Sequence, residues 1–232
     1  MTYRKTWVVV FALALLAAGV GCKKKDAATG QGSAADSAAP KAASSIPTAL
    51  PNSAPTTAPG VTVETTAGLA GADWAMKQDA IAKDANGQWA VTASASSSYN
   101  NAAGHDDYSP FQATGAPNVE TESDDGRAWS AKDPDAGMEW LDLQYSKPVF
   151  ANAVRVRESY GAGTIAKVDV YDEQGQPHTL WTGTDPTTGL NYFILNFPKT
   201  TYKTNHIRVA LATNVIPGFD EIDAVQLVGA EQ

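Results

Sequence analysis

The stretch Trp140–Tyr171 reads WLDLQYSKPVFANAVRVRESYGAGTIAKVDVY and decides the fold class. Three runs in it alternate apolar and polar residues with a period of two: Trp140–Tyr145, Ala153–Glu158 and Ala166–Tyr171. This alternation is typical of β-strands that bury one face. Comparable runs lie on either side of the stretch, at Trp89–Ser97, Thr179–Thr182, Tyr192–Phe197, Ile207–Leu211 and Ile222–Val228.

Turns rich in Gly, Pro and Asp separate these runs, as in the DEQGQP segment at 172–177. The sequence contains no long helical segments that could cover a parallel sheet. About eight short strands at this spacing therefore predict an all-β domain, a sandwich or a jelly roll.

Aromatic residues show where this domain begins. Of the 20 aromatics, 17 lie between Trp74 and Phe219, and the other three precede residue 12. A core needs such bulky apolar side chains, so we expect one folded domain from about residue 72 onward. Residues 72–85 can place Trp74, Gln78, Ile81 and Ala85 on one helical face. We expect a short helical lead-in over 72–87 and the β-sandwich over 88–230.

The N-terminus has the features of a targeting signal. Arg4 and Lys5 precede an uninterrupted apolar run over 7–20, which is too short to span a bilayer comfortably. Small residues follow, and then comes Cys22, the single cysteine of the chain. This order resembles a bacterial lipoprotein signal, which implies cleavage after residue 21 and acylation of Cys22. The alternative is an ordinary secretory signal or a signal anchor with an incidental cysteine.

Residues 22–71 are predicted to form a disordered tether. Ala, Ser, Thr, Pro and Gly supply 33 of the 43 residues in 26–68. Such a segment cannot bury enough surface to offset its chain entropy. We expect the tether to hold the folded domain away from a membrane; the alternative is a role in glycosylation or partner docking.

Charge and cysteine usage exclude two classes of function. The chain carries a net charge of −8, and from residue 72 onward it has 11 basic and 22 acidic residues. Such a domain repels a phosphate backbone, so we expect no nucleic-acid partner. A single cysteine also excludes a disulfide scaffold and a cysteine-based zinc site.

An ordered set of short motifs carries a family resemblance over residues 88–230. The motifs are Trp89–Ser97, Gln112–Asn118, Ala128–Trp129, Glu139–Leu143, Lys147–Val149, Val154–Glu158 and Pro217–Gly229. Together they resemble discoidin-like, galactose-binding-like jelly rolls, related to the coagulation-factor type C domains and the pappalysin scarf domain. The resemblance implies a jelly-roll β-sandwich that serves as a binding or adhesion module without catalysis.

In such modules the ligand binds to loops at one end of the sandwich, often against an exposed aromatic side chain. The candidate ligand-binding residues are Tyr99, Asn100, Tyr108, Phe111, Tyr160 and Phe219. Some loop aromatics are instead expected to pack as lids on the core.

The resemblance also implies one candidate cofactor, a structural calcium ion. In carbohydrate-binding relatives of this fold such an ion lies between an early loop and the last strand. Asn118 and Glu221 occupy the matching stretches here. The alternative is that both residues satisfy backbone groups of a turn and a strand end.

We therefore expect a lipid-anchored module in a bacterial cell envelope, at the outer membrane if the source is Gram-negative. Its folded domain would be periplasmic or extracellular and would recognise a glycan or a protein. One alternative is a protein–protein adaptor in an envelope complex. Another is a hydrolase that uses loop carboxylates, although no nucleophile elbow, phosphate loop or metal-type histidine spacing is present.

Overall fold

The computed structural model describes residues 57–232. The predicted signal peptide over 1–21, Cys22 and the tether up to residue 56 lie outside the described residues. Within 57–232, no helix combines the length and the apolar character needed to cross a membrane.

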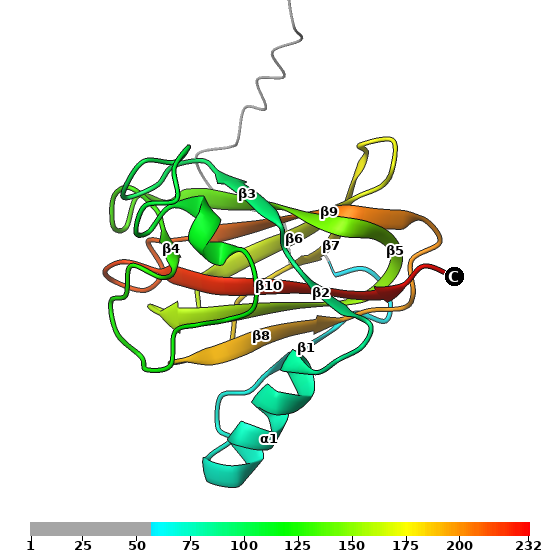
Figure 1. The fold of residues 1–232 in the computed structure, drawn as a ribbon, viewed down its shortest axis with the longest axis horizontal. Helices are drawn as coiled ribbons and strands as arrows, with labels where there is room; N and C mark the ends of the chain where they lie inside the picture. Colours follow the sequence, from blue (N-terminus) through cyan, green and yellow to red (C-terminus); the bar gives the residue numbers. More distant parts are fainter. Residues whose placement is uncertain (1–56) are drawn as a thin grey trace, which may run out of the picture. The chain divides into compact units, whose positions relative to one another are not determined.

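The described residues form an antiparallel β-sandwich, which confirms the predicted all-β class (Figure 1). The elements in chain order are β1 (Thr62–Thr65), α1 (Gly71–Ala82), β2 (Gly87–Trp89), β3 (Thr92–Ala95), the 3-10 helix η1 (Pro110–Ala113), β4 (Trp129–Ser130), β5 (Met138–Tyr160), β6 (Ile165–Tyr171), β7 (Pro177–Thr182), β8 (Asn191–Asn196), β9 (Lys203–Ala212) and β10 (Glu221–Ala230).

The long strand β5 belongs to both layers of the sandwich. Its first half pairs with β3 and β9, and β9 continues through β6 to β7. Its second half pairs with β8 and β10; β1 extends the sheet beyond β8, and β2 and β4 pair with β10. The register shifts between Gln144 and Val149, where the strand passes from one layer to the other. The jelly roll is thus one sheet curled around its own core.

The number of strands differs from the expected eight. The runs Trp140–Tyr145 and Ala153–Glu158, predicted as separate strands, are two parts of β5. The run Trp89–Ser97, predicted as one strand, is divided between β2 and β3. With β1 and the two-residue β4, the described residues contain ten strands.

The predicted disorder is wrong for residues 57–71. Thr57 forms a β-bridge with Trp181, and β1 pairs with β8 from Thr62↔Asn196 to Thr65↔Phe193. Val61 and Val63 are two residues apart, so both pack against the core on the same face of the strand. Pairing with β8 and these two contacts order an edge strand that composition alone predicts to be unfolded.

Helix α1 covers the outer face of the layer that contains β8. Its only buried side chain is Ile81, which packs with Tyr192 and Ile194. The Trp74 indole N–H donates to the side-chain oxygen of Asn191 at 3.0 Å. Of the predicted helical face, Trp74 and Ile81 contact the sheet, whereas Ala85 lies beyond the end of the helix at Ala82.

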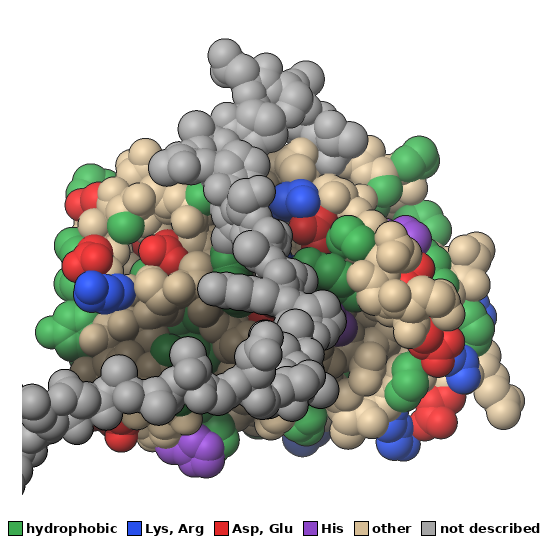
Figure 2. Space-filling model, turned by 90° about the horizontal axis from the view of Figure 1, so that it is seen from above, with side chains coloured by type: hydrophobic (Ala, Val, Ile, Leu, Met, Phe, Trp, Pro, Cys, Tyr) green, Lys and Arg blue, Asp and Glu red, His purple; other side chains and the backbone are tan. Residues whose placement is uncertain are grey.

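Two long connections meet at one end of the sandwich. Residues 96–128 link β3 to β4 and include η1, and residues 213–220 link β9 to β10. In Figure 1 the first connection folds over the end at which β4 and the start of β10 lie. Seen from above, acidic, basic and hydrophobic side chains are interspersed on the coloured part of the surface (Figure 2). The candidate site is built where these connections meet.

Candidate functional site

A cavity of about 140 Å³ lies at this loop end. Three segments contribute to it: the connection from β3 to β4, strand β4, and the start of β10 with the loop before it. The lining residues are Tyr99, Tyr108, Asp124, Ser130, Phe219 and Glu221. The cavity therefore combines aromatic rings with two carboxyl groups.

The three rings form an edge-to-face cluster. The ring centroid of Tyr99 lies 5.2 Å from that of Tyr108, at an interplanar angle of 69°. It lies 5.5 Å from that of Phe219, at 88°. Edge-to-face contact is a favoured arrangement of aromatic pairs. Because Tyr99 remains 54% exposed, part of its ring is free to contact a ligand.

Tyr108 is held in an unusual backbone conformation. Its φ of 60° lies in the left-handed region, which bulky residues rarely adopt. Its N–H donates to the Gly126 carbonyl at 2.9 Å, and its own carbonyl accepts hydrogen bonds from the Ser98 hydroxyl at 3.1 Å and the Ser130 N–H at 3.3 Å. Backbone strain of this kind persists only where the surroundings enforce it, and it concentrates at functional sites.

The Tyr108 hydroxyl donates a hydrogen bond of 2.5 Å to Asp124. This hydrogen bond, together with burial, raises the pKa of Tyr108 above its ordinary value. The phenol therefore stays protonated and keeps the exposed Asp124 carboxylate in a defined position at the cavity.

Glu221 is the buried acid of the cavity, with only 1% of its surface exposed. Its carboxyl oxygens accept the backbone N–H of Asp125 at 3.2 and 3.3 Å. Burial raises the pKa of Glu221 to about 8, and the nearby Asp124 carboxylate adds to the rise while the Asp125 N–H opposes it. The cavity thus holds an acid that lacks a compensating positive charge.

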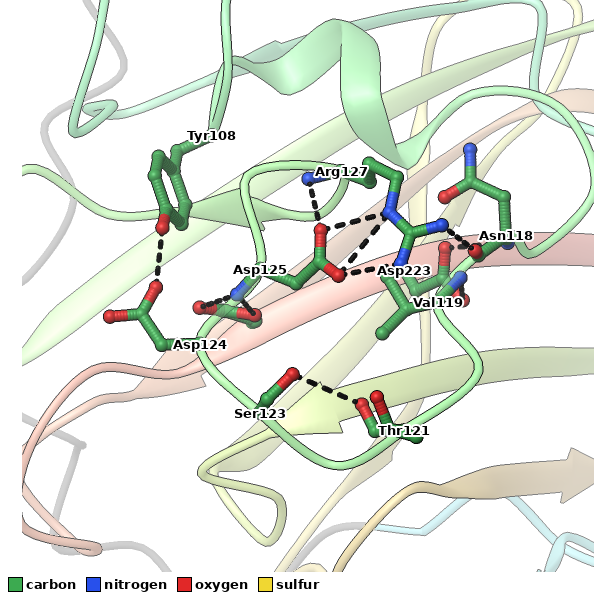
Figure 3. A network of polar contacts seen from close by, with 10 residues as sticks. Tyr108, Asn118, Val119, Thr121, Ser123, Asp124, Asp125, Arg127 and Asp223 are labelled. Carbon is green, nitrogen blue, oxygen red and sulfur yellow. Dashed lines mark hydrogen bonds and ion pairs between the residues drawn. The ribbon is translucent and has the colours of Figure 1, made fainter.

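The loop that carries Asp124 is fastened to β10 by a network of polar contacts (Figure 3). The Asp223 carboxylate accepts the backbone N–H groups of Asn118 at 3.1 Å and Val119 at 3.3 Å. Burial raises the pKa of Asp223 to about 6. Arg127 forms an ion pair of 2.7 Å with Asp125 and donates to the Asn118 carbonyl at 2.8 Å. Both ends of the loop are therefore fixed around the cavity.

The structure brings together three of the six predicted ligand-binding residues: Tyr99, Tyr108 and Phe219. The other three lie elsewhere, and the roles predicted for them stay predictions. Asn100 donates to the Asp107 carbonyl at 2.8 Å, which closes its own loop. Phe111 stacks on His105, with ring centroids 3.6 Å apart. Tyr160 ends β5, opposite Glu221 in the ladder with β10.

Sequence reasoning missed Asp124, Ser130 and Glu221 as parts of a ligand cavity. The acidic pair Asp124-Asp125 before a glycine is visible as a loop signal. Glu221 is visible as an acid at the start of the last strand, but nothing in the sequence shows that it faces Tyr108. Ser130 carries no sequence signal of its own.

Asn118 and Glu221, the residues predicted to hold a calcium ion, contact different protein partners, and the calcium site stays a prediction. The Asn118 N–H and carbonyl are bonded to Asp223 and Arg127, whereas Glu221 accepts from Asp125. The Arg127 guanidinium thus already places a positive charge at the Asn118 carbonyl. Within 57–232, no three His, Cys, Asp or Glu side chains are grouped to hold a metal ion.

Fold and cavity together define the class: a jelly-roll β-sandwich with an aromatic and acidic cavity among its loops. Residues 78–232 match the family model described as "Pappalysin-1, SD scarf domain, C-terminal". The match spans more than half of the chain, so the chain belongs to this family. The predicted resemblance to the pappalysin scarf domain is thereby confirmed.

Solved structures with a similar fold include several carbohydrate-binding modules. A fucose binding module of Streptococcus pneumoniae is 16% identical, with a TM-score of 0.45 over 61% of this chain and 93% of that chain. The family 32 module from C. perfringens NanJ, solved with galactose, is 17% identical, with a TM-score of 0.44 over 61% and 98%. Chitosan-binding module 1 from a Paenibacillus sp. IK-5 chitosanase/glucanase is 15% identical, with a TM-score of 0.44 over 60% and 94%. No curated protein sequence matches the chain.

Proposed function

We propose that the folded domain is a non-catalytic glycan-binding module whose binding site is the loop-end cavity. One observation carries this proposal: three aromatic rings and two carboxyl groups line a single cavity. An aromatic ring packs well against the C–H face of a sugar, because both are apolar. Carboxylates accept strong hydrogen bonds from sugar hydroxyls. Apolar walls with a few directed polar groups are the usual composition of a ligand site.

The rigidity of the cavity supports the same proposal. Tyr108 is clamped by backbone hydrogen bonds on both sides, and the loop 118–127 is fastened to β10 through Asp223. A site that is already ordered loses little conformational entropy when a ligand binds. Tight recognition therefore requires no closing lid.

A hydrolase is the second candidate, and one observation favours it. Glycoside hydrolases use two carboxyl groups, of which the general acid has a raised pKa. Asp124 and Glu221 line the same cavity, and burial raises the pKa of Glu221 to about 8. Against this role, the Asp125 N–H and the Tyr108 hydroxyl already occupy the two carboxyl groups.

Glycan-array screening followed by calorimetric titration of the best ligand tests the binding proposal. Replacing Tyr99 or Phe219 by Ala should weaken binding by about tenfold or more, because each change removes a ring from the cavity. The matched control is Phe111→Ala, which removes a 40% exposed loop ring outside the cavity. If Phe111→Ala weakens binding as much as Tyr99→Ala does, the cavity is not the site.

The glycans found by the array also distinguish a binding module from a hydrolase and from a protein–protein adaptor. Turnover of a bound glycan that disappears in Glu221→Gln would replace the binding proposal with the hydrolase. Absence of glycan binding, together with specific capture of an envelope protein through the same cavity, would favour the adaptor. Thermal melting of each variant separates loss of the site from loss of the fold.

We further propose that the module is displayed on a lipid anchor at the bacterial envelope. The support is the position of Cys22 directly after a short apolar run and a series of small residues. Cys22→Ser should release the protein from the membrane fraction, because several acyl chains bind a bilayer stably and none would be attached. Unchanged membrane retention of Cys22→Ser would overturn the lipid anchor.

A further inference from the structure

The charge of the cavity distinguishes among sugars. Its two charged lining residues, Asp124 and Glu221, are both acids, and none of its described lining residues is basic. Arg127 lies in the same loop, but its guanidinium faces Asp125 and the Asn118 carbonyl (Figure 3). The protein itself therefore supplies no cation to this pair of carboxyl groups.

A buried carboxyl group without a nearby cation is costly to ionise. Glu221 is 1% exposed; the Asp125 backbone N–H is a neutral donor to it, and the side chain next to it is a second acid, Asp124. A neutral sugar would bring no positive charge to Glu221. A ligand cation placed between the two carboxyl groups would compensate both of them.

The aromatic rings favour the same kind of ligand. The faces of aromatic rings carry partial negative charge and attract cations within about 6 Å of the ring centroid. Tyr99, Tyr108 and Phe219 meet edge to face, so their ring faces point in different directions around the cavity. Rings in several orientations beside carboxylates form the kind of cage that holds an ammonium group.

The size of the cavity limits what it can enclose. Its volume of about 140 Å³ is well below the roughly 300 Å³ at which sites for drug-sized ligands begin. The cavity therefore suits one end group or one sugar unit of a longer chain. The excess of acidic over basic residues from residue 72 onward would also attract a cationic polymer to the domain.

We propose that the ligand is a saccharide with a free amino group, held with its ammonium among the aromatic rings, the carboxylate of Asp124 and the carboxyl group of Glu221. This inference rests on the proposed glycan-binding function and names the ligand class of the same cavity. In this arrangement the rings contact the ammonium and the adjacent C–H groups, the Asp124 carboxylate neutralises the ammonium, and the ammonium makes ionisation of Glu221 less costly.

The test compares two ligand series of equal length, glucosamine oligomers and N-acetylglucosamine oligomers, by calorimetric titration of the full-length protein. The amino form should bind about tenfold or more tightly, because acetylation removes the positive charge. This preference should shrink as salt is added, because salt screens the attraction.

Asp124→Asn is the decisive variant, because Asn keeps an acceptor for the Tyr108 hydroxyl and removes the charge from an exposed position. It should weaken binding of the amino oligomer about fivefold more than it weakens binding of the N-acetyl oligomer, so that the preference for the amino form shrinks. The matched control is Asp106→Asn, which removes an exposed charge from the same connection outside the cavity and should leave both affinities unchanged.

The outcomes separate the two proposals. Equal affinity for both series, or an Asp106→Asn effect as large as that of Asp124→Asn, overturns the amino-sugar inference and leaves the glycan-binding proposal in place. Binding of some other neutral glycan in this cavity, with neither series bound, likewise overturns the amino-sugar inference and keeps the glycan-binding proposal. If no glycan binds at all, the proposed function fails as well.

Discussion

The two outer faces of the sandwich each hold an arginine among aromatic rings, in very different surroundings. On the face covered by α1, the guanidinium carbon of Arg157 lies 5.4 Å from the ring centroid of Trp74 and 5.1 Å from that of Tyr192. On the other face, the guanidinium carbon of Arg208 lies 4.3 Å from the ring centroid of Trp140 and 5.9 Å from that of Tyr171. Arg157 is 4% exposed, whereas the Arg208 side chain is 20% exposed.

The partners of the two arginines differ as well. Asp142 forms an ion pair with Arg208 and a 2.9 Å contact with His206. Arg157 donates to the Gln78 side chain of α1, and within 57–232 no carboxylate lies within ion-pair distance of it. Burial accordingly lowers the pKa of Arg157. Under α1, a neutral side-chain amide thus takes the place that the carboxylate has at Arg208. We infer that Arg157 fastens α1 to the sheet.

Of the three substitutions that test this comparison, Arg157→Ala should lower the free energy of unfolding most. The change removes the buried stem and both cation–π contacts, and it leaves the Gln78 side chain without its partner. We expect the free energy of unfolding to fall by about 2–4 kcal/mol, measured by urea denaturation.

Arg157→Lys is the matched control, because it keeps the charge and loses the planar group that stacks on both rings. It should recover part of the loss. If Arg157→Ala costs less than about 0.5 kcal/mol, in the range of ordinary surface substitutions, Arg157 does not fasten α1.

Some strands of this fold could be predicted from the sequence and others could not. The runs in Trp140–Tyr171 follow a period of two because one face of each packs in the core, so their strands could be predicted. β1 could not, because TVET lies in an Ala-, Ser-, Thr- and Pro-rich segment and its order comes from pairing with β8. The continuity of β5 was hidden by Lys147-Pro148, which suggests a break although the chain only shifts register there.

The cavity could be predicted only in part, because its residues come from loops whose folding the sequence pattern does not show. Loop aromatics indicated Tyr99, Tyr108 and Phe219, but the same rule included Phe111, which stacks on His105 instead. Composition does not show which loop ring turns inward. The distance in sequence between Asp124 and Glu221 also hides their meeting, because it depends on how the connection from β3 to β4 folds onto β10.

Asp142→Asn, on the face that carries Arg208, should cause an intermediate loss of stability. Burial works to raise the pKa of Asp142, but hydrogen bonds from His206 and Arg208 outweigh it, and the pKa lies below its ordinary value. Near neutral pH we expect Asp142→Asn to cost about 1–2 kcal/mol of unfolding free energy, because both partners lose a charged acceptor.

The pH dependence checks the sign of this contribution. A lowered pKa means that the stabilisation is present above the unfolded-state pKa, which is about 4 for Asp. It is lost as the pH falls through the lower folded-state value. Urea denaturation between pH 7 and pH 2 should therefore show a shallower acid-side decline for Asp142→Asn than for the parent protein. Parallel declines would show that the pair contributes no proton-linked stability.

Arg208→Ala should cause the smallest loss of unfolding free energy of the three substitutions. Arg208 remains partly in water, so its cation–π contact with Trp140 and its ion pair with Asp142 are each weakened by solvent. We expect a loss of about 1 kcal/mol or less in the same urea assay. A double-mutant cycle with Asp142→Asn should give a coupling of about 0.5–1 kcal/mol, because the two side chains are in direct contact. A loss as large as that of Arg157→Ala would mean that burial under α1 is not what separates the two arginines.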